Sequence, residues 1–255
     1  MSTLTIAPRF RGPAGSGNGG YVCGRLASYV EAANDVTTVS LRRPPPLDRP
    51  LTVERQDGSA ALRDGADLVA EATVGAFAEG PVPPISYDDA VAAEKAYQGL
   101  LHHPFPTCFV CGTGRQPGDA LCLRPGRYAA GRTACTWAPD KGLGNSAGLV
   151  APEYVWSALD CPGGWTSDLE ERPLVLGTMT ASCRAPVEAG ERHVVVGQLL
   201  AHDGRRTFTA SGLYAASGLL LARAEQVWVA VDPAVFQRLN APSARPRRRP
   251  DDKEP

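Results

Sequence analysis

Three features of this 255-residue sequence predict an α+β fold built from two tandem repeats. Each repeat is one helix wrapped by an antiparallel sheet. First, each half contains a helical segment followed by a series of strand-like runs. Second, Asp-Gly turn signals fall at matching places, residues 57–58 and 203–204. Third, residues 21–22 match 154–155, and residues 68–72 match 220–224. A repeat longer than roughly 100 residues indicates a duplicated domain rather than a solenoid.

The helical segment of the second half, residues 151–165, carries the most informative pattern. Pro152 suits a first helical position, and apolar residues recur at helical spacing as far as Leu159. Asp160 follows that stripe directly, just before Pro162 and two glycines, where we expect the helix to stop or kink. A carboxylate among apolar residues is costly to bury unless something uses it, so Asp160 is the first candidate site residue.

The remaining elements follow from capping and alternation. A glycine-rich turn at 12–20 precedes a helix at about 20–33, with Asn18 as its N-cap. No Gly-Lys-Ser/Thr follows the glycines, which disfavours a phosphate-binding loop. Ser86 and Asp89 form a capping box for a helix through about residue 101. Strands are expected at 4–6 with 9–11, 37–41, 51–55, 60–62, 67–77, 121–123, 133–137, 174–184, 193–201, 206–215 and 219–231.

These elements divide the chain into four parts. Residues 1–80 form the N-terminal repeat, expected to be structural, and 81–106 form a linker with an amphipathic helix. Residues 107–239 form the C-terminal repeat with the site. Residues 240–255 are too polar to pack, which predicts a disordered tail.

Composition excludes several classes of partner. The net charge of −1 and the pI of about 6.4 favour neither nucleic acid nor an acidic membrane surface. No apolar run approaches the ~20 residues that span a bilayer. The N-terminus lacks the features of a secretion signal, so the seven cysteines predict reduced thiols and a cytoplasmic location.

Three short segments carry a resemblance to a known family: residues 18–21, 157–160 and 221–226. Together with the repeat, over roughly residues 4–232, they resemble the double-hotdog acyl-CoA thioesterase II-like family. The resemblance implies a double hotdog in which the repeats form one pseudo-dimeric unit. It also implies hydrolysis of a small-molecule acyl thioester, with coenzyme A as part of the substrate and no cofactor. Open sheet edges in duplicated hotdogs favour pairing into a homodimer.

The family uses a helix Asp, a strand Thr and a late-strand Gln to orient the hydrolytic water. The resemblance assigns these roles to Asp160, Thr178 (with Thr180 as the alternative) and Gln226. Asp160 is suited to take a proton from water or to attack directly, and the amide of Gln226 fixes the water without titrating. We expect substrate contacts from the two helices, at Gly19, Gly20, Tyr21 and Trp156.

Comparison of the two repeats indicates that only the second half carries the polar residues Asp160 and Gln226. Ala27 occupies the position equivalent to Asp160, and Val74 the position equivalent to Gln226. We therefore expect one working site per chain.

Other interpretations remain open. Asp160 is equally typical of a helix cap or a surface ion pair, and Gln226 of the solvent face of a strand. Gly19 and Gly20 also suit close helix–sheet packing. A non-catalytic acyl or acyl-CoA binder is the alternative function. A double-hotdog hydratase requires an Asp–His pair in one loop, which the sequence lacks.

Cys108 and Cys111, followed by Gly112, have the spacing of a zinc knuckle. No second Cys-x-x-Cys exists, so we expect no metal and keep zinc as an alternative. A redox pair is disfavoured because no thioredoxin-like βαβ pattern surrounds the motif. Cys161 is a candidate nucleophile beside Asp160, although no His is near it in sequence. The residues that would complete a zinc site are His102, His103, Cys122 or Cys135.

Overall fold

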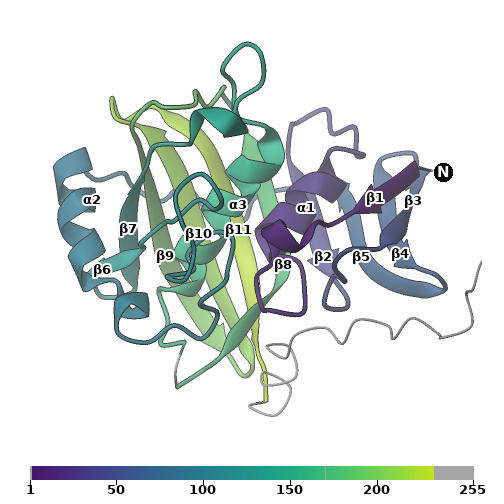
Figure 1. The fold of residues 1–255 in the computed structure, drawn as a ribbon, viewed down its shortest axis with the longest axis horizontal. Helices are drawn as coiled ribbons and strands as arrows, with labels where there is room; N and C mark the ends of the chain where they lie inside the picture. The colour runs from purple at the N-terminus through teal and green to yellow at the C-terminus, as the bar shows by residue number, and fades with distance from the viewer. Residues whose placement is uncertain (1, 170, 233–255) are drawn as a thin grey trace, which may run out of the picture.

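A single 11-stranded antiparallel sheet organises the chain in a computed structural model that describes residues 2–169 and 171–232 (Figure 1). The strand order is β1-β3-β4-β5-β2-β8-β11-β10-β9-β7-β6. The predicted tail lies outside the described residues. The strands are β1 (Ser2–Thr5), β2 (Thr37–Leu41), β3 (Pro50–Gln56), β4 (Ser59–Asp64), β5 (Asp67–Val74), β6 (Gly126–Ala129), β7 (Arg132–Trp137), β8 (Leu174–Cys183), β9 (His193–Asp203), β10 (Arg206–Ala215) and β11 (Leu220–Ala230).

The two halves of the chain meet in the middle of this sheet, where β2 pairs antiparallel with β8. Thr38 lies opposite Thr180, and their hydroxyl oxygens are 2.8 Å apart. Ser40 Oγ and Thr178 Oγ1 are 3.3 Å apart in the same seam. Backbone pairing and these hydroxyl contacts join the two sets of strands into one sheet.

Helices α1 (Gly19–Ala27) and α3 (Pro152–Gly164) pack against each other and against the sheet (Figure 1). Their contact requires glycine, because a Cβ at Gly20 would lie 2.8 Å from the carbonyl oxygen of Trp156. A Cβ at Gly24, one turn later, would lie 2.7 Å from Glu153 Cα. The helix backbones therefore touch directly. Within the described ranges, no helix is both long enough and apolar enough to cross a membrane.

A short third helix, α2 (Tyr87–Ala93), lies beside β6 and β7 at the far edge of the sheet (Figure 1). The Ser86 hydroxyl accepts the Asp89 backbone N–H, as the capping box predicts. The helix then continues only as 3-10 turns, Glu94–Ala96 and Gln98–Leu100. The N-terminal residues Pro8–Phe10 are also a 3-10 turn instead of the expected strand.

Two further predicted boundaries are wrong, and α3 does not stop at its proline. Helix α1 ends at Ala27 instead of residue 33, because the backbone N–H groups of Tyr29 and Val30 bond three residues back instead of four. Residues 121–123 form no strand; β6 pairs with β7 instead. Helix α3 continues through Pro162 to Gly164.

Strand side chains bind the carbonyl groups of two α3 residues, Leu159 and Pro162 itself. Leu159 O accepts the amide of Gln226 (2.8 Å) and the hydroxyl of Ser211 (2.7 Å). Pro162 O accepts the Thr133 hydroxyl at 2.7 Å. Buried polar residues of β7, β10 and β11 thus hold the part of α3 that contains the proline.

Candidate functional site

A cavity of about 290 Å³ lies beside the N-terminus of α1, between that helix, the second half of α3 and the start of β8. Its walls are mainly apolar, including Trp165, Leu176 and Trp228. Polar or nucleophilic side chains also line it, among them His103, Cys108, Cys111, Asp160 and Cys161. A small apolar cavity with a few polar groups on one wall is typical of a ligand site.

Asp160 is the acidic group of this wall, and its side chain is 2% exposed. Oδ2 accepts the side-chain amide of Asn18 at 2.8 Å and the backbone N–H of Gly20 at 3.1 Å. Oδ1 is buried and has no hydrogen-bond partner among the described residues. One carboxylate oxygen of Asp160 therefore caps the N-terminus of α1. The helix-cap interpretation expected a cap, but the helix that Asp160 caps is α1 and not α3, which carries it. The other oxygen is unpaired.

Burial changes the acidity of this carboxyl group. It raises the pKa of Asp160 well above its usual value, to about 7, although the hydrogen bonds from Gly20 and Asn18 act in the opposite direction. The cause is loss of hydration, which disfavours the charged form.

Gln226 is also buried, at 2% exposure, so the solvent-face interpretation is wrong. It does not line the cavity. Its amide nitrogen donates to Leu159 O and Ser211 Oγ, and its amide oxygen accepts the Thr209 hydroxyl at 2.8 Å. These bonds hold the helix backbone immediately before Asp160, and they leave the amide little capacity to orient a water molecule.

Thr178 and Thr180 point away from this site, which corrects the expected assignment. Gln226 contacts α3, so it lies on the helix-covered face, and its cross-strand partner Met179 shares that face. Because successive strand residues alternate, the two threonines lie on the opposite face, where their hydroxyls contact β2. Neither lines the cavity.

Of the four residues expected to contact substrate, only Gly19 lines the cavity. Gly20 instead donates to Asp160 and forms the helix crossing. Tyr21 is buried and stacks on Phe10, with ring centroids 4.0 Å apart. Trp156 is buried where α3 faces α1. Packing between elements occupies these two aromatic rings.

Three cysteines form a cluster on the same wall, which sequence reasoning missed. The Sγ atoms of Cys108, Cys111 and Cys161 all lie within 4.8 Å of one another, and all three side chains are buried. Hydrogen bonds from the two neighbouring thiols lower the pKa of Cys108, whereas burial raises that of Cys111. The only sequence signal for the third member was a cysteine next to Asp160.

His103 lines the cavity as well, but its ring is already engaged. Nδ1 accepts the backbone N–H of Phe105 at 2.8 Å, and Nε2 lies 3.1 Å from Cys111 O. Burial lowers the pKa of this imidazole. Although the fold brings a histidine to the same cavity as Asp160, it does not leave the free acid–base pair that a hydratase needs.

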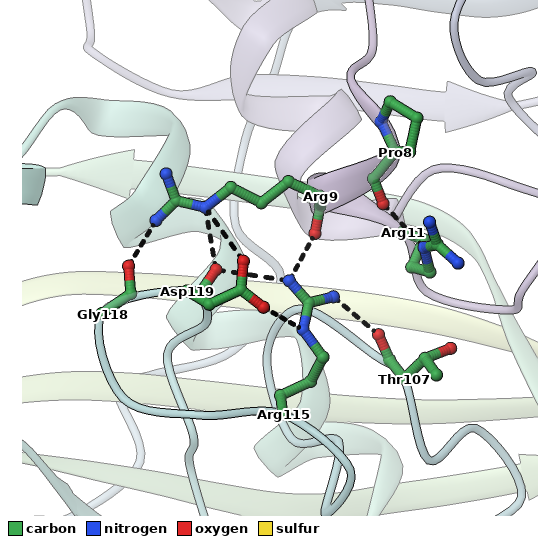
Figure 2. A network of polar contacts seen from close by, with 7 residues as sticks. All are labelled: Pro8, Arg9, Arg11, Thr107, Arg115, Gly118 and Asp119. Atoms are coloured by element: carbon green, nitrogen blue, oxygen red, sulfur yellow. Dashed lines mark hydrogen bonds and ion pairs between the residues drawn. The ribbon is translucent and has the colours of Figure 1, made fainter.

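The loop that carries Cys108 and Cys111 is fixed to the N-terminal part of the chain by an arginine cluster (Figure 2). Arg115 donates to Thr107 O (2.9 Å), to Arg9 O (3.0 Å) and to the Asp119 carboxylate (2.7 Å). Arg9 in turn donates to Gly118 O at 2.8 Å. The Arg115 side chain is only 8% exposed, whereas those of Arg9 and Asp119 are 39% and 53% exposed.

Solved structures with the same fold include three that match over nearly the whole chain. A putative thioesterase from Novosphingobium aromaticivorans is 14% identical, with a TM-score of 0.62 over 90% of this chain and 95% of that one. An acyl-CoA thioesterase II from Mycobacterium marinum is 12% identical, with a TM-score of 0.58 over 91% and 93%. A protein with the hot dog fold from Alicyclobacillus acidocaldarius is 12% identical, with a TM-score of 0.54 over 91% and 93%.

The predicted α+β double hotdog is thereby confirmed, and the resemblance to thioesterase II-like proteins holds at the level of the fold. No match came from the protein-family models or from the curated proteins. Because the identities are low, the chemistry of this chain rests on its own residues.

Proposed function

We propose that this chain hydrolyses a small-molecule acyl thioester whose acyl group enters the cavity, with Asp160 as the general base. The observation that carries the proposal is the state of the carboxylate. Oδ2 is held by Asn18 and Gly20, whereas Oδ1 is buried without a hydrogen-bond partner in the described structure. A fixed carboxylate with one unpaired oxygen, on the wall of an apolar cavity, suits a base that activates water.

The reaction needs one base and one oxyanion donor. Asp160 takes a proton from water as the water oxygen attacks the thioester carbonyl. The tetrahedral intermediate then expels the thiolate, which takes the proton from Asp160, giving a carboxylic acid and a thiol. Gly19 lines the cavity at the first position of α1, so its N–H at the positive end of the helix dipole is the proposed oxyanion donor.

Gln226 is proposed as a positioning residue for this base. Its amide binds Leu159 O, on the residue directly before Asp160, instead of the water that the resemblance implied. Replacement of Gln226 would therefore affect the reaction through the orientation of α3, which carries Asp160.

Coenzyme A is the proposed thiol part of the substrate. Arg42 and Arg43 line the cavity, and both side chains are more than half exposed, 54% and 58%. Guanidinium groups are suited to phosphate, although here they pair with Glu71 and Asp67. The cavity volume is near the lower limit of ~300 Å³ for small-molecule sites, which favours short acyl groups. A cytoplasmic location and a homodimer remain parts of this proposal.

The test is thiol release from a series of acyl-CoAs of increasing chain length. Asp160→Asn is expected to lower kcat by at least ~100-fold, the contribution of a positioned general base. The matched control is Asp203→Asn, at an exposed carboxylate at the end of β9 that pairs with Arg206. Undiminished turnover by Asp160→Asn would exclude this mechanism.

A non-catalytic acyl-CoA binder is the second candidate, because two of the three expected polar residues do not reach the cavity. Thr178 lies on the other face of the sheet, and the amide of Gln226 is occupied. Acyl-CoA binding by calorimetry without thiol release from any member of the series would select this function.

A further inference from the structure

The three clustered cysteines match the geometry of a metal site. Cys108 Sγ and Cys161 Sγ are 3.9 Å apart, and Cys111 Sγ lies within 4.8 Å of both. Zinc–sulfur bonds of about 2.3 Å in a tetrahedron separate sulfur atoms by about 3.8 Å. We propose that Cys108, Cys111 and Cys161 bind a Zn²⁺ ion, which replaces the sequence-based expectation of no metal.

The loop backbone is built to bring two of these sulfurs together. Gly112 N donates to Cys108 O at 3.0 Å, which closes the turn around the Cys-x-x-Cys pair. A Cβ at Gly112 would lie 2.6 Å from Cys108 N, so the turn requires glycine. The third sulfur comes from α3, 53 residues after Cys108 in the chain. The site therefore joins a loop to the helix that carries Asp160.

Two N–H groups point at sulfur atoms of the cluster. Trp165 Nε1 donates to Cys111 Sγ at 3.4 Å, and Asn18 Nδ2 lies 3.9 Å from Cys108 Sγ. Such N–H donors are typical of the groups that surround metal-bound cysteines. Three thiolates buried together repel one another strongly, and a divalent cation offsets two of the three charges.

The fourth coordination position faces the cavity. All three cysteines and Asp160 line it, whereas both ring nitrogens of His103 are engaged elsewhere. Three protein ligands and one open position are typical of catalytic zinc, and four protein ligands of structural zinc. We infer that water or a substrate atom completes the coordination.

A disulfide fits the cluster less well. A disulfide needs an S–S distance of about 2.05 Å, so Cys108 and Cys161 would have to move together. It would also leave Cys111, with its Trp165 donor, unused.

Metal content provides the first test, and it does not depend on thioester hydrolysis. The full chain is expressed with added zinc and purified under reducing conditions without chelators, and zinc is counted by mass spectrometry. We expect one zinc per chain in the wild type. Serine at any of the three positions should lower the zinc retained by at least about tenfold.

Cys135→Ser is the matched control, because Cys135 is equally buried but lies outside the cluster. Cys122→Ser is a second control, and both positions were candidate ligands from the sequence. Both variants should keep the wild-type zinc content. A wild type without zinc, or Cys161→Ser with full zinc, would overturn the proposal.

Cobalt substitution in the wild type gives a readout that does not depend on the folding of any variant. Co²⁺ at this site should show thiolate-to-cobalt charge-transfer bands and the intense visible bands of tetrahedral coordination. Absence of both from cobalt-treated wild-type protein would refute a three-cysteine site. A zinc site without hydrolysis would leave this inference intact and exclude only the hydrolase.

Discussion

Replacement of Gly20 by alanine perturbs the helix crossing that positions Asp160. A Cβ at residue 20 would lie 2.6 Å from Asp160 Cβ, 2.8 Å from Trp156 O and 3.1 Å from Ser157 Cα. Two of these atoms belong to the α3 backbone, and the third is the Cβ attached to it. No flexible side chain can move aside, so the helices must separate.

The expected magnitude is the sum of three contributions. Alanine has a higher helix propensity than glycine, which stabilises the variant by about 1 kcal/mol. An extra methyl group in a close-packed contact costs about 1–3 kcal/mol. Separation of the helices also weakens the Gly20 N–H bond to the Asp160 carboxylate, a charged hydrogen bond worth about 1.5–3 kcal/mol. We expect a net loss of about 1.5–5 kcal/mol in the free energy of unfolding, with Tm lower by roughly 3–20 °C.

Urea and thermal unfolding of Gly20→Ala, compared with Gly80→Ala, measure this loss. Gly80 has no positive φ, and no atom lies within 4 Å of a Cβ added there. The Gly80 variant should differ from the wild type by less than about 1 kcal/mol. If Gly20→Ala were as stable as Gly80→Ala, the direct backbone contact between α1 and α3 would be refuted.

Two further predictions concern buried polar groups away from the cavity. Gln226→Leu leaves the hydrogen-bonding partners of a buried amide unsatisfied, so unfolding free energy should fall by about 1–3 kcal/mol. Gln198→Leu, at a half-buried position of β9, should lower the free energy of unfolding by less than Gln226→Leu does. Equal losses for the two variants in urea unfolding would contradict the positioning role of Gln226. Burial lowers the pKa of His193, so the unfolded chain takes up its proton at higher pH than the folded chain. The stability that His193 contributes is complete above its usual pKa of about 6.5 and is lost as pH falls below it, with a slope of at most ~1.4 kcal/mol per pH unit. His193→Gln should flatten the urea stability profile between about pH 6.5 and 5; profiles of equal slope would show that His193 does not titrate in this way.

Much of the fold was predictable because its signals are local. Alternating residues and Asp-Gly turns predicted the strands of both halves, and Asn18 and Ser86 marked the helix starts through side-chain caps. Helix ends were less predictable. Whether a terminal turn is α or 3-10 depends on contacts that the sequence pattern does not contain.

The sequence by itself determined the duplicated architecture and singled out Asp160, because an acid after an apolar stripe stands out without any structure. Tertiary structure decided which groups surround it. The close helix crossing at Gly20 gave the carboxylate its two donors, and a loop far away in the chain placed two cysteines beside Cys161. Strand register turned Thr178 to the opposite face, because one residue of shift exchanges the two faces of a strand. Spacing along the chain specifies local conformation, whereas register and helix separation are set by packing between distant segments.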